Sequence, residues 1–319
     1  MRKELAIQEW GTYQGSGVKP TDFDVYWEEA KAEVEALGTD YCLQLIDFPS
    51  QIGEAYELTF RGVDDAKIVC QFVKPKRLEK FPLIFQFHGY HCNSGDLIDK
   101  LPFVGEGFGI VAMDVRGQGG QSQDTLQTSG GTLKGHLIRG IEDGKENLFY
   151  RKVYQDIYQL IKIVQSMSDV EHDNLYVSGV SQGGALALVC ASLCPNIKKA
   201  FVQYPFLSDF REAYNLDVTQ SAYEELAYWF HFRDPLHEKE EEVFDNLEYI
   251  DIQHFVPAIE ADVLWGMGLE DHICHPKTQF AVYNNIQSPK QLLFYPEYGH
   301  EYLPKYNDLV FRILKGERI

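Results

Sequence analysis

The sequence predicts an α/β fold in which a mostly parallel central sheet is flanked by helices and carries an N-terminal extension and a helical insertion. Three observations lead to this prediction. From residue 83 onward, short apolar strand-like runs alternate with helical stretches, which is typical of a parallel sheet covered on both faces. Residues 1–80 contain instead one helical pattern and then three strand-like runs. Residues 208–260 interrupt the later alternation and contain no good strand.

Composition and charge restrict the class of protein. The chain has 319 residues, of which 45% are hydrophobic and 24% charged. These values are ordinary for a globular domain and exclude a disordered, collagen-like or coiled-coil chain. The 29 Lys and Arg against 48 Asp and Glu give a formal net charge of −19. A nucleic acid or an anionic membrane would be repelled on average, so we expect neither as a partner.

The first part of the expected single domain, which spans residues 1–319, is the N-terminal extension over residues 1–80. Apolar side chains recur there at helix spacing and a glycine follows them: Phe23, Trp27, Ala30, Val34, Leu37 and then Gly38. Strand-like runs over 41–48, 55–61 and 67–73 come next. Their spacing predicts an antiparallel edge of the sheet.

The remainder of the chain predicts the parallel part of the sheet. Short apolar runs expected to be strands cover 83–87, 109–115, 175–177, 199–203, 263–267 and 292–295. Helical patterns cover 150–167, 185–194 and 306–314. The insertion over 208–260 is far longer than an ordinary loop and holds two helical patterns, over 222–230 and 238–247. We expect this insertion to form a lid or a pocket wall over one end of the sheet.

The segment Gly179-Val180-Ser181-Gln182-Gly183 matches the nucleophile-elbow pattern G-x-S-x-G. An apolar strand-like run precedes it and an Ala-rich helical run follows, which is the context that this motif requires. In the elbow, a strained strand-to-helix turn exposes the serine hydroxyl at the end of the sheet. The sequence therefore predicts an α/β-hydrolase fold with Ser181 as nucleophile.

A serine nucleophile needs a base and a carboxylate that orients the base, and in this fold they follow in the order Ser, Asp or Glu, His. Asp271 follows the strand-like run 263–267, and His300 follows the run 292–295. The ends of parallel strands meet at one edge of the sheet, so we expect Asp271 and His300 to complete a triad. Neighbouring polar residues stay open as weaker alternatives: Asp262, Glu270, His272 and His275.

An acyl-transfer site also needs donors for the oxyanion. The backbone N–H of Gln182, directly after the nucleophile, is one expected donor, and that of Tyr90, after the run 83–87, is the second. No metal site competes, because neither His237-Glu238 nor His300-Glu301 is followed by the second histidine of a zincin. We expect no metal and no cofactor.

Taken together, these motifs resemble the acetyl xylan esterase and cephalosporin C deacetylase group, carbohydrate esterase family seven. The resemblance rests on residues 88–90, 116–118, 179–184, 268–271 and 300–301 and on their order. It implies a deacetylase of small O-acetylated sugars and similar acetyl esters, and a homohexamer whose active sites face an internal cavity. It also implies that Tyr90 lines the acetyl pocket and that Arg116 and Gln118 support the site. Residues 272–276 depart from the family, which more often has a Pro-Pro pair there.

Other functions and the location follow from weaker signals. A broad short-chain carboxylesterase, a peptidase and a non-catalytic binding protein on the same fold are the alternatives. No apolar signal-peptide core follows the N-terminus, and no run is long enough to span a membrane. None of the six cysteines forms a C-x-x-C pair. We therefore expect free thiols and a cytoplasmic protein.

Overall fold

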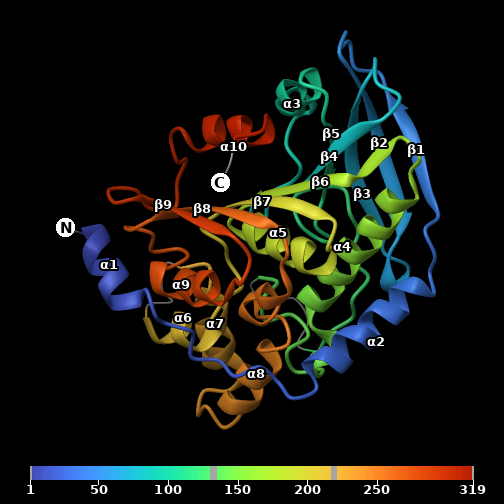
Figure 1. Ribbon diagram of the computed structural model, residues 1–319. Helices are drawn as coiled ribbons and strands as arrows, with labels where there is room; N and C mark the ends of the chain where they lie inside the picture. The colour runs from blue at the N-terminus through green and yellow to red at the C-terminus, as the bar shows by residue number, and fades with distance from the viewer. Residues whose placement is uncertain (1, 130–134, 217–220, 318–319) are drawn as a thin grey trace.

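A nine-stranded sheet forms the centre of the computed structural model, which describes residues 2–129, 135–216 and 221–317 (Figure 1). Its order is β1-β2-β3-β5-β4-β6-β7-β8-β9. The strands are β1 (Tyr41–Ile46), β2 (Gly53–Arg61), β3 (Lys67–Pro75), β4 (Phe81–Phe87), β5 (Gly109–Met113), β6 (Val170–Val180), β7 (Ile197–Gln203), β8 (Asp262–Gly268) and β9 (Lys290–Tyr295). The prediction of a mostly parallel central sheet is confirmed.

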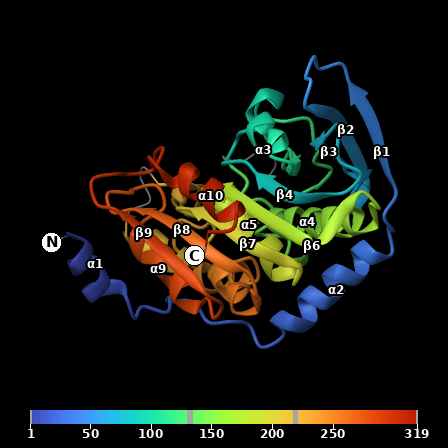
Figure 2. The same cartoon turned by 45° about the horizontal axis from the view of Figure 1, so that its top comes forward.

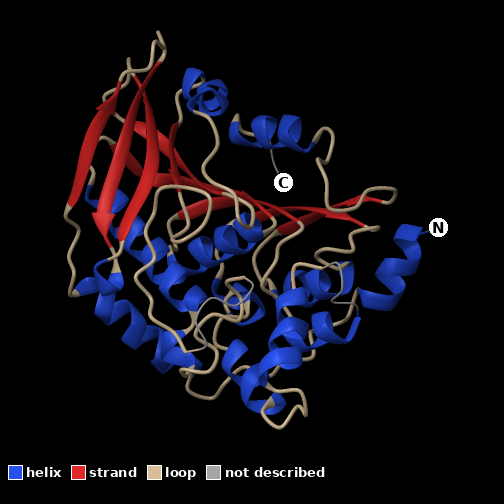
Figure 3. Cartoon of the chain, turned by 180° about the vertical axis from the view of Figure 1, so that it is seen from behind, coloured by secondary structure: helices blue, strands red, loops and turns tan. Residues whose placement is uncertain are grey.

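Strand direction divides the sheet into two parts. Strands β4 to β9 pair only in parallel with one another. Strands β1, β2 and β3 are antiparallel, and β3 pairs antiparallel with β5. The antiparallel strands stand up steeply from the rest of the twisted sheet (Figures 2 and 3). The antiparallel arrangement expected for the runs within 41–73 is therefore confirmed.

Helices cover both faces of the sheet (Figure 1). The larger layer holds α2 (Phe23–Glu35), α4 (Phe149–Ser166), α5 (Gln182–Leu193) and α9 (Pro276–Asn285), and the smaller holds α3 (Leu101–Gly105) and α10 (Tyr306–Leu314). Alternate residues of β4 pack into the cores on opposite faces of the sheet. Leu83 and Phe85 belong to the core under α4 and α5, and Ile84 belongs to the core under α10. This alternation is what a strand buried on both faces requires.

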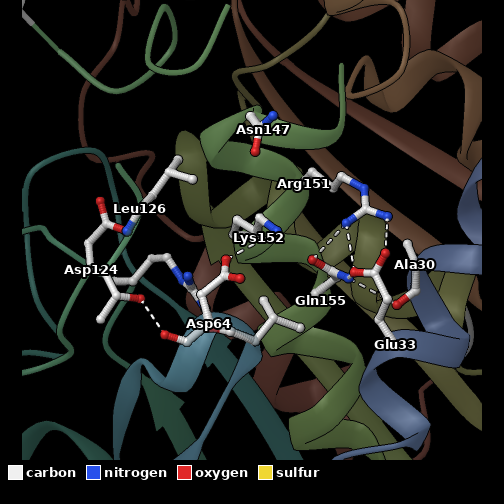
Figure 4. Close-up of polar contacts among 12 residues, drawn as sticks. Ala30, Glu33, Asp64, Asp124, Leu126, Asn147, Arg151, Lys152 and Gln155 are labelled. Atoms are coloured by element: carbon white, nitrogen blue, oxygen red, sulfur yellow. Dashed lines mark hydrogen bonds and ion pairs between the residues drawn. The ribbon is translucent and has the colours of Figure 1, made fainter. Parts of the chain in front are cut away.

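The N-terminal helix α2 is fastened to α4 by polar contacts (Figure 4). The guanidinium of Arg151 donates to both carboxylate oxygens of Glu33, at 3.0 and 2.9 Å, and Gln155 donates to the carbonyl of Ala30 at 3.0 Å. On the other side of α4, Lys152 pairs with Asp64 at 3.1 Å. These contacts hold the extension against the helix that packs beside α5.

The segment between β7 and β8 contains α6 (Phe210–Leu216), α7 (Glu224–Arg233) and α8 (Glu240–Leu247). The rings of Tyr214, Phe230 and Phe244 pack together at centroid distances of 5.4 to 6.1 Å and join the three helices. Short 3-10 turns lie at Val63–Asp65, Leu97–Lys100, Lys145–Asn147, Ile252–His254 and Val256–Ala258.

Four α-helices of the described residues were not expected from the sequence: α1 (Arg2–Trp10), α3, α6 and α9. Helix α3 is only five residues long, too short for a periodic pattern. Helix α9 did carry a signal, because Pro276 occupies a first-turn position and the His275 ring caps the Lys277 N–H. In the described residues, no helix is both long and apolar enough to cross a membrane.

Candidate active site

The turn between β6 and α5 has the conformation expected of a nucleophile elbow. Ser181 has φ 58° and ψ −120°, which is strained for a residue with a Cβ. Its N–H donates to the Gln203 carbonyl at 3.0 Å, and its own carbonyl accepts from Phe206 at 3.1 Å. The end of β7 and the loop that follows it therefore hold the turn in place.

Glycines allow the close packing around this turn. A Cβ on Gly179 would lie 1.9 Å from the Gly183 carbonyl oxygen, and one on Gly183 would lie 2.0 Å from the Phe87 oxygen. Since side-chain carbons do not approach oxygen so closely, only glycine fits at either position. The end of β4 consequently lies directly against the start of α5.

The predicted base and its carboxylate lie together at the ends of β8 and β9. His300 Nδ1 is 2.9 Å from Asp271 Oδ2. The other carboxylate oxygen accepts from the N–H groups of Ile273 and Cys274, both at 2.9 Å. Asp271 is 1% exposed and its position is fixed by its own loop. With the Nδ1 proton directed at Asp271, Nε2 of His300 is left as the basic nitrogen.

Cys274 lies between Ser181 and Asp271: its thiol faces the serine, and its backbone N–H donates to the carboxylate. The serine hydroxyl contacts the Cys274 thiol, and burial raises the pKa of that thiol well above its usual range. Among the contacts of the described residues, no hydrogen bond joins Ser181 to His300. In the free forms of such sites this bond is often long and shortens only when substrate binds.

The weaker alternatives have other partners. Glu270 pairs with Arg2, and Asp262 pairs with Lys199 at 3.1 Å. His275 caps α9, its ring packs against Trp10 at 5.5 Å, and burial lowers its pKa. His272 lines a separate cavity of about 320 Å³ with His275. Of these neighbouring residues, Asp271 is the carboxylate that touches His300.

The two expected oxyanion donors lie on loops tied together by glutamines. The side-chain amides of Gln118 and Gln182 bond reciprocally, at 2.7 and 3.1 Å. Gln118 also accepts from the His91 N–H at 3.0 Å, and Gln182 accepts from the Tyr150 hydroxyl at 2.9 Å. Gln118 thus links the loop that carries Tyr90 to the first residue of α5, where backbone N–H groups have no partner within the helix.

His88 holds the start of the same loop. Its Nε2 must accept from the Val115 N–H, at 2.9 Å, so its Nδ1 carries the proton and donates to the Gly89 carbonyl at 2.8 Å. Burial lowers the pKa of this histidine, which favours the neutral ring that these bonds need.

Arg116 lies below the site, on the loop after β5. Its guanidinium is fully buried and forms a two-pronged ion pair with Asp156 of α4, with both N–O distances 2.7 Å. One nitrogen also reaches the Val63 carbonyl at 3.5 Å. Its main partner is this carboxylate, so Arg116 anchors the loop after β5 to α4.

Glu225 of α7 was missed by the sequence analysis. It is 3% exposed and accepts from the Tyr90 hydroxyl. A signal existed, because Glu225 falls at helix spacing with Ala222 and Trp229, on the apolar stripe of its helix. Beside Tyr90 lies a cavity of about 470 Å³ whose lining includes His91 and His136.

Chemically, a strained serine turn and a histidine held by a carboxylate are the combination that serine acyl transfer uses. The described residues hold no group of three or more His, Cys, Asp or Glu side chains suited to a metal ion. The sequence model of the acetyl xylan esterase family (AXE1) matches residues 2–316. The chain belongs to this acetyl xylan esterase family. The family resemblance seen in the sequence is therefore confirmed.

Solved structures of other family members superpose closely. Acetyl Xylan Esterase 1 from Thermoanaerobacterium sp. JW/SL YS485 is 44% identical, with a TM-score of 0.94 over 97% of each chain. An acetyl xylan esterase from Paenibacillus sp. R4 is 32% identical, with a TM-score of 0.93 over 98% of this chain and 99% of that one. The α/β-hydrolase fold predicted from the elbow motif is confirmed.

A curated relative is more distant. The acetyl esterase Axe7A of Xylanibacter ruminicola is 26% identical over 293 residues, which are 88% of this chain. The chain spans 63% of the length of that relative.

Proposed function

We propose that the protein is a serine esterase that removes acetyl groups from small O-acetylated substrates, namely acetylated xylo-oligosaccharides and acetyl esters of the cephalosporin C type. The observation that carries this proposal is the 2.9 Å contact between His300 and Asp271 in the loops beside the strained Ser181 turn. Membership of the acetyl xylan esterase family supports acetylated carbohydrate as the substrate class.

In the first step, Nε2 of His300 takes the proton of the Ser181 hydroxyl, and the serine oxygen attacks the acetyl carbonyl carbon. The backbone N–H groups of Tyr90 and Gln182 stabilise the resulting oxyanion. His300, now charged and oriented by Asp271, donates its proton to the departing sugar oxygen. The products are the free alcohol and an acetyl-enzyme on Ser181.

In the second step, His300 removes a proton from a water molecule, and the resulting hydroxide attacks the acetyl-enzyme. The same N–H groups stabilise the second oxyanion. Its collapse releases acetate as the proton returns to Ser181.

The test is hydrolysis of nitrophenyl esters with acyl groups from two to eight carbons, with Ser181→Ala measured alongside. We expect the variant to lose several orders of magnitude in kcat, because a triad knockout keeps only about 10³–10⁴-fold catalysis over water. A variant within about tenfold of wild type would exclude Ser181 as the nucleophile.

The chain-length profile separates the deacetylase from a broad short-chain carboxylesterase. A preference for acetyl that depends on Ser181 supports the deacetylase, and release of acetate from acetylated xylo-oligosaccharides then extends the result to carbohydrate. A hydrophobic pocket distinguishes one methylene by only about 1–3 kcal/mol, so strong rejection of longer chains requires steric exclusion. A flat profile would favour the carboxylesterase.

Assembly and location complete the proposal. From the family resemblance we infer a homohexamer, which light scattering after size-exclusion chromatography tests directly. Six free thiols, four of them buried, suit a reducing compartment such as the cytoplasm.

A further inference from the structure

Glu225 is a buried carboxylate that reaches the active-site loop from α7, in the segment between β7 and β8. One of its oxygens accepts from the Tyr90 hydroxyl at 2.5 Å, and the other from the Leu137 N–H at 2.8 Å. Both donors are neutral, although a buried carboxylate is most stable beside a cation. The residue therefore bears a desolvation cost that its contacts only partly offset.

The Tyr90 hydroxyl is bonded on both sides. It donates to Glu225 and accepts from the His136 N–H at 2.6 Å. Gly135 makes room for this arrangement, because its φ is +91° and a Cβ there would lie 1.8 Å from the carboxyl carbon of Glu225. The Glu225 side chain and the His136 backbone thus hold the tyrosine hydroxyl from two sides.

Phe206 connects that ring to the turn that carries Ser181. The Tyr90 ring packs on Phe206 with centroids 5.4 Å apart, and the Phe206 N–H donates to the Ser181 carbonyl. The backbone of Tyr90 also supplies one of the proposed oxyanion donors. A shift of this ring would change both the space beside Ser181 and the aim of that N–H group.

We propose that Glu225 is the positioning residue that holds the Tyr90 ring beside Ser181 and thereby sets the preference of the site for the short acetyl group. The inference rests on the serine esterase function proposed above. It gives α7 a role in acyl specificity without any contact between Glu225 and the reacting atoms.

The ionisation of Glu225 makes this role sensitive to pH. Its charged and titratable neighbours are Tyr90, with His91 and His136 packed on the tyrosine ring, Tyr150 of α4, and Glu224 on its own helix. Burial raises the pKa of Glu225 to about 7. The carboxylate accepts two hydrogen bonds, whereas protonation turns one oxygen into a donor. The hydrogen bond that holds the Tyr90 hydroxyl on Glu225 therefore weakens as the pH falls through about 7.

The experiment measures the ratio of kcat/KM on acetyl and butyryl nitrophenyl esters across pH in wild type, Glu225→Gln, Tyr90→Phe and the double variant. Hydrolysis of both esters depends on the ionisation of His300 in the same way, so this dependence cancels in the ratio. Glu238→Gln makes the same chemical change at an exposed position of the same segment and serves as the matched control.

We expect the wild-type ratio to fall on acidification from about pH 8 to about pH 6, where Glu225 gains its proton. Glu225→Gln should lower the ratio roughly tenfold, the scale of one methylene, and make it independent of pH. Tyr90→Phe should lower the ratio similarly. The double variant should lower it little further, because the two single substitutions remove the same hydrogen bond. Glu238→Gln should behave as wild type.

An unchanged ratio in Glu225→Gln, or effects of the two substitutions that add in full, would overturn the role of Glu225 while the esterase function stands. Tyr90→Phe keeps the Glu225 carboxylate and its Leu137 contact. It therefore tests the hydrogen bond between Tyr90 and Glu225 even if Glu225→Gln does not fold. Hydrolysis that survives Ser181→Ala would overturn the proposed function and this inference together.

Discussion

At the scale of single residues, the contacts of Asp271 fix the orientation of its carboxylate. One oxygen accepts two backbone N–H groups of its own loop, and the other faces His300. Its carboxylate cannot rotate without losing both sets of contacts. The imidazole is thereby held in one tautomer, with Nε2 available to Ser181.

We predict that Asp271→Asn lowers kcat by about 10⁴-fold, the effect of a wrong histidine tautomer. The asparagine oxygen would keep the two backbone donors, so its NH₂ group would face Nδ1 of His300 and force the proton onto Nε2. Steady-state hydrolysis of nitrophenyl acetate measures the loss.

Glu270→Gln is the control for Asp271→Asn, because Glu270 is the adjacent carboxylate and pairs with Arg2 instead. A large loss in Glu270→Gln together with near-normal activity in Asp271→Asn would reverse the assignment of the acid.

At the scale of elements, the contact between α2 and α4 decides how the N-terminal extension is held. Arg151 is almost completely buried, whereas its partner Glu33 is half-exposed. The hydrogen bonds from Arg151 lower the pKa of Glu33 below its ordinary value of 4.5. A lowered carboxyl pKa contributes stability above pH 4.5, and that contribution is lost as the pH falls through the lowered value.

We predict that Glu33→Gln destabilises the protein by about 1 kcal/mol at neutral pH, since it weakens a two-pronged charged contact and leaves Arg151 without its anion. The difference from wild type should shrink on acidification below pH 4.5. Urea denaturation at several pH values measures it. Glu28→Gln, an exposed position on the same helix, should change little; an equal effect of both substitutions would contradict the prediction.

At the scale of the whole molecule, segments far apart in sequence meet in a buried acidic cluster. The hydroxyl of Tyr13 donates to Asp209 at 2.7 Å, and the Asp209 N–H donates to Asp251 at 2.6 Å. Glu248 lies 2.6 Å from a ring nitrogen of His254. Burial raises the pKa of Glu248 to about 8 and lowers that of His254, so the pair is held neutral around one shared proton.

We predict that Glu248→Gln stabilises the protein at pH 8 by at least about 1 kcal/mol, the value of one pKa unit, and has less effect near pH 5. The folded protein keeps a proton on Glu248 that the unfolded chain releases above 4.5, so wild-type stability falls as the pH rises from 4.5 to about 8. The amide has no such proton to lose. Thermal unfolding at both pH values measures the effect, with exposed Glu242→Gln as control; a gain that is largest at pH 5 would contradict it.

The whole molecule also shows which parts of the site could be anticipated. Ser181 is recognisable because its strand, turn and helix are contiguous in sequence. Asp271 and His300 follow because parallel strands end at one edge of a sheet, so chain order predicts which loops meet. Glu225 could not be assigned, because its contact with Tyr90 joins positions 135 residues apart.

The amino-acid sequence by itself determined the parallel sheet, its antiparallel edge and the order of the three residues proposed as the triad. Hydrophobic periodicity and turn chemistry act over a few neighbouring residues, and the right-handed connections of parallel strands then restrict the topology. Only the tertiary structure decided which carboxylates are buried and what each of them contacts. Hydrogen bonding depends on chain segments brought together by folding, and no local pattern encodes the hydrogen-bond partners of Glu225, Glu248 or Asp156.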